Sequence, residues 1–85
     1  MAVYYFDECK WVDVGYETIY QFIDSEGETL AEVALKDSDG QLWKFEVMLP
    51  ERYRLNGVNP GGIVATQTAA RRISELILLS TIVTR

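Results

Sequence analysis

Residues 29–49 read TLAEVALKDSDGQLWKFEVML, and this stretch decides the fold. Its second half, residues 41–49, alternates apolar and charged side chains, and residues 29–36 show the same alternation. Because successive side chains of a strand point to opposite faces of a sheet, both halves are predicted to be half-buried β-strands. The Asp-Ser-Asp-Gly segment between them favours a turn, since Gly40 adopts positive φ without steric cost. The stretch therefore predicts a β-hairpin.

Upstream of the hairpin, residues 16–23 are mostly aromatic or β-branched, which favours a third strand. A short helix is the alternative there, because several apolar residues of this segment also match helical spacing. A turn at residues 24–27 joins the segment to the hairpin. Residues 2–6 and 10–14 are candidates for two further short strands.

Downstream, Pro50 ends the last strand of the hairpin because proline has no N–H to give to a ladder. Residues 50–62 are predicted to form a long irregular loop. A helix is expected over residues 63–80, beginning near Ile63 with Gly62 as its cap, or a little later with Thr66 as its cap. Its predicted buried stripe consists of Ala69, Ile73, Leu76, Ile77 and Ser80.

The sum is an α+β fold: an antiparallel β-meander of three to five strands with one C-terminal helix packed on one face. At 85 residues the chain suits a single domain, residues 1–85. Within it, we expect strands and hairpins over 1–49, a loop over 50–62 and a helix over 63–80.

Composition narrows the possible functions. The net charge of −5 opposes direct binding of nucleic acid, which depends on Lys and Arg. A single cysteine, Cys9, cannot form an intrachain disulfide, and no apolar run approaches the ~20 residues of a membrane span. We expect a cytoplasmic protein that contacts neither nucleic acid nor a membrane.

Groups for bond-making chemistry are scarce. There is no histidine to serve as a base, and one cysteine cannot supply a zinc site. Residues 37–40 resemble the opening of a calcium loop, but Trp43, Lys44 and Phe45 stand where further ligands would follow. The sequence therefore predicts no enzyme, no metal and no cofactor.

Apolar and aromatic side chains exceed what one helix on one sheet face can cover. Two explanations are open: either the N-terminal segment covers the other sheet face and completes the core, or the surplus surface is shared with a second copy or another protein. The first functional hypothesis is a small acidic protein-binding module that docks on a basic surface of another protein. Its predicted partner-binding residues are aromatic and acidic: Tyr4, Tyr5, Trp11, Asp24, Glu26, Glu28, Asp37 and Asp39.

In this hypothesis the carboxylates occupy positions meant for phosphates and steer association electrostatically. Small acidic viral proteins that inhibit nucleic-acid-binding machinery, such as anti-CRISPR proteins, share this general profile. The alternative is a structural or assembly subunit, a component of a virion or an oligomeric scaffold, that self-associates as a homodimer or larger assembly. Its self-association surface would be the apolar end of the helix, with Leu78, Leu79 and Ile82.

Overall fold

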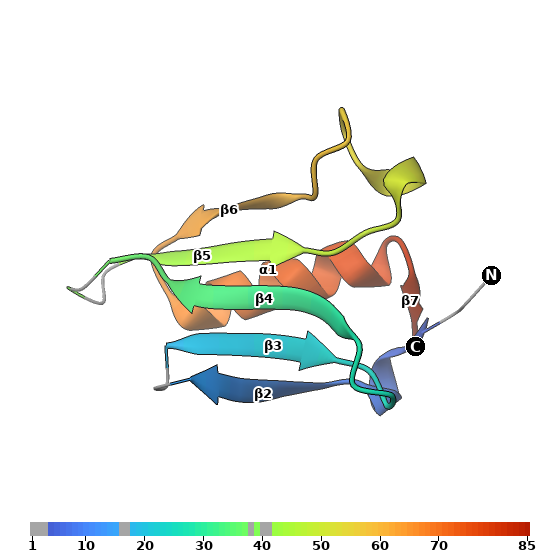
Figure 1. Cartoon of the computed structure of the whole chain (residues 1–85), viewed down its shortest axis with the longest axis horizontal. Coiled ribbons are helices and arrows are strands. Elements are labelled where there is room, and N and C mark those ends of the chain that lie inside the picture. Colours follow the sequence, from blue (N-terminus) through green and yellow to red (C-terminus); the bar gives the residue numbers. More distant parts are fainter. Residues whose placement is uncertain (1–3, 16–17, 38, 40–41) are drawn as a thin grey trace.

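The structure is a computed structural model that describes residues 4–15, 18–37, 39 and 42–85. Five strands form an antiparallel meander in the order β2-β3-β4-β5-β6. They are β2 (Lys10–Gly15), β3 (Ile19–Ile23), β4 (Thr29–Leu35), β5 (Trp43–Val47) and β6 (Gly61–Val64). The single α-helix of the described residues, α1 (Gln67–Leu79), lies across one face of this sheet against β4, β5 and β6 (Figure 1). The predicted α+β meander with a C-terminal helix is confirmed.

The hairpin that decides the fold forms as expected. In β4 and β5, Ala31, Val33, Phe45 and Val47 face α1 and are buried. The Lys36 N–H donates to the Leu42 carbonyl at 2.9 Å and closes the connection between the strands. Ser38, Gly40 and Gln41 of the predicted turn lie outside the described residues.

Residues 19–23 form a strand and not the alternative helix. Phe22 of β3 pairs with Ala31 and is buried beneath α1. Tyr16 and Glu17 of the predicted segment lie outside the described residues. Gly27 adopts a φ of +83° in the turn that follows, which is why glycine suits this position.

The region predicted as loop and helix start differs from expectation. Residues 50–60 include a 3-10 turn, η2 (Glu51–Tyr53), and a tight bend between Leu55 and Val58. Residues 61–64 then form β6, so the helix begins later than residue 63, at Gln67. The Thr66 side chain caps it by accepting from the Ala69 N–H at 3.0 Å. Pairing with β5 places Ile63 and Val64 in the sheet, which suits their β-branched side chains.

The buried stripe of α1 also differs from the predicted one. Ala70, Ser74 and Leu78 are fully buried, whereas Leu76 is 53% exposed. Ser74 tolerates burial because its hydroxyl donates to the Ala70 carbonyl at 2.8 Å. Small side chains at 70 and 74 let the helix lie close to the sheet.

The two ends of the described chain meet. Strand β1 (Tyr4–Tyr5) pairs in parallel with β7 (Val83–Thr84), next to the end of α1 (Figure 1). A 3-10 turn, η1 (Phe6–Glu8), follows β1 and places the Phe6 ring 5.7 Å from that of Phe22. The described part of the N-terminal segment, from Tyr4 onward, therefore adds to the core on the helix side of the sheet and does not cover the other face.

Candidate functional site

The candidate site is the sheet face opposite α1, which we call the open face. Cross-strand register fixes its composition, because residues facing each other in a ladder share a face. One row across the face consists of Val12, Gln21, Glu32 and Glu46, and the next consists of Ile19, Ala34, Lys44 and Ile63. No element of the described chain lies over this face (Figure 1).

Two carboxylates stand side by side at the centre of the open face. Glu32 on β4 is directly opposite Glu46 on β5. Like charges directly opposite each other destabilise a sheet. Their described partners are neutral amides: Gln21 donates to Glu32 Oε2 at 3.0 Å, and Asn59 donates to Glu46 Oε2 at 3.3 Å. Among the described residues neither carboxylate forms an ion pair.

Apolar side chains border the carboxylate pair. Ile19 is 37% exposed and Ile63 is 52% exposed, in the row next to the two glutamates. Val14, in the irregular end of β2, is also exposed. Exposed apolar side chains gathered beside charged groups occur at protein interfaces, so this face is a candidate docking surface.

The structure separates the acidic residues that the sequence suggested would act together. Asp24, Glu26 and Glu28 lie in the connection from β3 to β4, whereas Asp37 and Asp39 lie at the other end of β4. A seven-residue strand spans roughly 20 Å, so the two groups occupy opposite ends of the sheet. They do not form one surface.

Asp24 and Glu28 have clear local roles. The Asp24 Oδ1 accepts from the Glu26 N–H at 2.9 Å and from the Glu28 N–H at 2.8 Å, which holds the turn. Glu28 Oε2 accepts from the Tyr4 hydroxyl at 2.8 Å. This hydrogen bond, followed by burial, raises the pKa of Tyr4 to about 12. Tyr5, the next predicted site residue, is 53% exposed.

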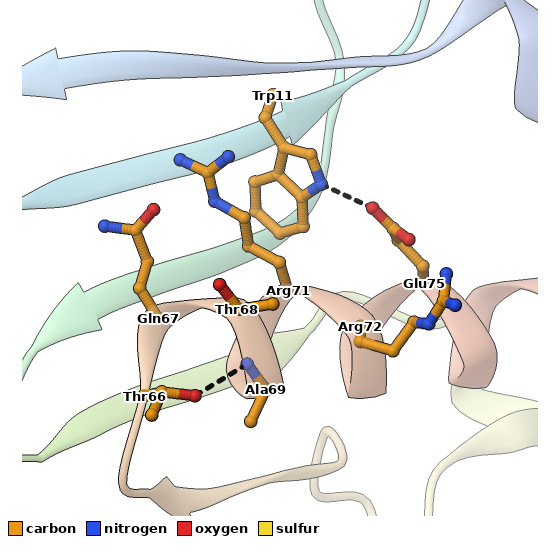
Figure 2. A pocket seen from close by; sticks show the side chains of 8 residues that line it. All are labelled: Trp11, Thr66, Gln67, Thr68, Ala69, Arg71, Arg72 and Glu75. Carbon is orange, nitrogen blue, oxygen red and sulfur yellow. Dashed lines mark hydrogen bonds between the residues drawn. The ribbon is translucent and has the colours of Figure 1, made fainter.

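Trp11 lies on the helix side of the sheet and joins β2 to α1. Its indole N–H donates to Glu75 Oε2 at 2.8 Å, and its ring centre is 5.0 Å from that of Phe22 (Figure 2). The Arg71 guanidinium lies over the Trp11 ring at 5.3 Å and over the Tyr20 ring at 4.5 Å. These contacts stabilise the packing of β2 and β3 against the helix.

A hollow of 610 Å³ opens beside the start of α1, between the helix and Trp11 (Figure 2). Arg71, Arg72 and Glu75 line it, and none of them was among the predicted site residues. Their spacing along α1 brings them to one side of the helix. The hollow itself could not be predicted from the sequence, because it forms between this side of α1 and Trp11, which lies on a distant strand.

The three residues predicted for self-association lie in or against the core. Leu78 is fully buried, and Leu79 and Ile82 are half-buried against the same cluster. The end of α1 is apolar on all sides because β1 and β7 cover the side that the sheet does not. The pairing of β1 with β7 joins the two ends of the chain, so it depends on tertiary structure. Leu78 therefore offers no exposed surface to a second copy.

Cys9 is half-buried, and burial raises the pKa of its thiol. Its Sγ donates to the Tyr5 carbonyl at 3.3 Å.

The described residues contain no group of three or more His, Cys, Asp or Glu placed to hold a metal ion. Nor is any helix among them long and apolar enough to cross a membrane.

Comparison of the chain with protein-family models, with curated proteins and with solved structures finds no match in any of the three.

Proposed function

We propose that this protein is a binding module that docks through its open face on a basic surface of another protein. The observation that carries the proposal is the Glu32–Glu46 pair, two adjacent carboxylates with neutral partners on an uncovered sheet face. A Lys or Arg side chain of the partner would relieve their mutual repulsion, and Ile19 and Ile63 would supply apolar contact beside it.

The proposed partner class is a protein whose basic surface otherwise holds nucleic-acid phosphates. Paired carboxylates can take the place of phosphate groups, and docking there would inhibit nucleic-acid binding. This places the proposed interface at Glu32 and Glu46, and not at the five turn carboxylates, which lie at opposite ends of the sheet.

Matched charge variants test the proposal. The double variant Glu32→Gln/Glu46→Gln and the control Asp37→Asn/Asp39→Asn each remove two negative charges, so both change the net charge equally. We expect the tagged open-face variant to bind a partner isolated from the native host at least tenfold more weakly, while the control binds it like the unmodified chain. The apparent affinity of the unmodified chain should also fall as salt is added.

A defined probe gives a second readout. Titration of the labelled protein with a peptide of alternating Lys and Val should shift amide resonances of β3, β4 and β5, whereas a Glu and Val peptide should not. Equal loss of binding in both double variants would contradict the proposal, because it would show a general charge effect. Retained binding in both would contradict it as well.

A second candidate function, a self-associating assembly subunit, is supported by a different observation. Strand β6 forms one edge of the sheet, and among the described strands only β5 pairs with it. An unpaired edge strand is a ready template for another chain. A homodimer would use this edge, since Leu78 is buried.

A further inference from the structure

The two edges of the sheet differ in how they are protected. Strand β2 carries Lys10 and Asp13, and its register shifts between Asp13 and Gly15. Charges and bulges of this kind prevent edge-to-edge pairing. Strand β6 has neither: residues 61–64 are Gly-Gly-Ile-Val, and their register with β5 is regular.

The hydrogen-bond pattern identifies which backbone groups of β6 face outward. The Val47 N–H donates to the Pro60 carbonyl at 2.9 Å, which marks this as a hydrogen-bonded pair. Hydrogen-bonded and non-hydrogen-bonded pairs alternate along an antiparallel ladder. Gly62 and Val64 therefore bond to β5, and the N–H and C=O groups of Gly61 and Ile63 point away from the sheet.

This arrangement is self-complementary. Gly61 and Ile63 lie symmetrically about Gly62, so a twofold axis at Gly62 sets Gly61 of each copy opposite Ile63 of the other. Each of these pairs can exchange both N–H···O bonds, because both of its residues present their free groups to the edge. The positions of the free groups are compatible with this register.

The side chains fit the same register. A hollow of 400 Å³ lies beside β6 on the open face, bordered by Val58, Gly61, Gly62 and Ile63. Gly61 leaves space there for the Ile63 side chain of the second copy. A Cβ at position 61 would lie 2.7 Å from the Phe45 carbonyl oxygen, so local packing keeps this position without a side chain.

Leu55 and Val58 add apolar surface at the same place. They are 80% and 65% exposed, and their segment extends past the β6 edge in Figure 1. Their tight bend is stable because Asn56 and Gly57 adopt the positive φ values of +55° and +75° that its geometry needs. Of the two, Val58 borders the hollow beside β6.

We propose that β6 of a second copy of this chain pairs antiparallel with β6, about a twofold axis at Gly62. The pairing joins the two sheets into one continuous sheet. This inference deepens the assembly-subunit function and rests on it. The pairing needs no charged group, so it should persist at salt concentrations that weaken docking on a basic surface.

Sedimentation of the full chain from low micromolar to millimolar concentration tests the pairing. Ile63→Pro removes the outward donor together with the isoleucine side chain, and it leaves the bonds of Gly62 and Val64 to β5 in place. Ile63→Lys puts a charge at the edge without changing the backbone. Both variants should raise the dimer dissociation constant at least tenfold. The control Ile19→Lys, on the same face but on the interior strand β3, should leave it unchanged.

Amide hydrogen exchange of the unmodified chain locates the contact. The Gly61 and Ile63 amides should exchange at least tenfold more slowly in the concentrated sample, whereas amides of the opposite edge, β2, should not change. A chain that stays monomeric at millimolar concentration would overturn the pairing and the assembly-subunit function together. A dimer that forms equally well with both Ile63 variants, without protection of these amides, would overturn only the β6 pairing.

Discussion

Tyr4 and Glu28 show how a single contact links two distant parts of the chain. The Tyr4 hydroxyl donates to the Glu28 carboxylate across 24 residues of sequence, between the N-terminal strand and the turn before β4. The hydrogen bond to Glu28 favours the protonated hydroxyl, and this bond, followed by burial and by the negative charge of Glu28, raises the pKa of Tyr4.

This contact predicts a pH dependence. Because the folded-state pKa of Tyr4, about 12, exceeds the ordinary value of 10.0, the contact stabilises the fold fully below pH 10 and is lost as the pH rises toward 12. Ultraviolet titration should show a tyrosine that ionises at about pH 12. In Glu28→Gln that late titration should move toward pH 10, and in Tyr4→Phe it should vanish. A late titration unchanged in both variants would contradict the assignment.

At the scale of elements, α1 owes its place to a stripe of small and apolar residues four apart. Ala70, Ser74 and Leu78 face the sheet, and Ser74 is compatible with burial because its hydroxyl bonds within the helix. Strands β2 and β3 are held to the same helix by the Trp11–Glu75 hydrogen bond and by the contacts of Arg71 with the Trp11 and Tyr20 rings. The helix thus holds the whole sheet from one side and leaves the open face free.

The orientation of the helix is testable with two leucines only two residues apart. Leu78→Ala removes a fully buried side chain and should lower the free energy of unfolding by about 2–5 kcal/mol. Leu76→Ala removes an exposed one and should change it by less than about 0.5 kcal/mol. Urea denaturation of both variants gives the comparison. Equal losses would show that the buried face of α1 is assigned wrongly.

At the scale of the whole molecule, the fold is closed by the meeting of its two ends. Val83 of β7 is almost fully buried and pairs with Tyr4 of β1, and the Arg85 guanidinium lies 5.1 Å from the centre of the Phe6 ring. This small parallel pair covers the last turn of α1. The apolar end of the helix is thereby part of the core.

Closure by β7 should contribute to stability. Val83→Ala removes two buried methyl groups and should lower the free energy of unfolding by about 2 kcal/mol. Thr84→Ala, at an exposed neighbouring position, is the matched control and should have little effect. Thermal and urea unfolding of the two variants measure the difference. If Val83→Ala behaves like the control, β7 does not contribute to the core.

Local patterns were enough for the hairpin, the meander and the presence of a C-terminal helix. The alternation over residues 41–49 and the short turns between strands are properties of neighbouring residues, and they left few ways to arrange the sheet. The expectation of uncovered sheet surface came from the same counting of apolar faces.

Contacts between distant residues determined the rest. Residues 61 and 62 were predicted as loop and residues 63 and 64 as helix, and it is pairing with β5 that makes all four a strand. Ser74 was not predicted to be buried, and its burial depends on the hydrogen bond from its hydroxyl to the Ala70 carbonyl. The carboxylates at residues 24–28 and 37–39 look like one cluster in the sequence, but the length of β4 separates them. Glu32 and Glu46, fourteen positions apart, become neighbours only through strand register, so the candidate site is a product of the folded sheet.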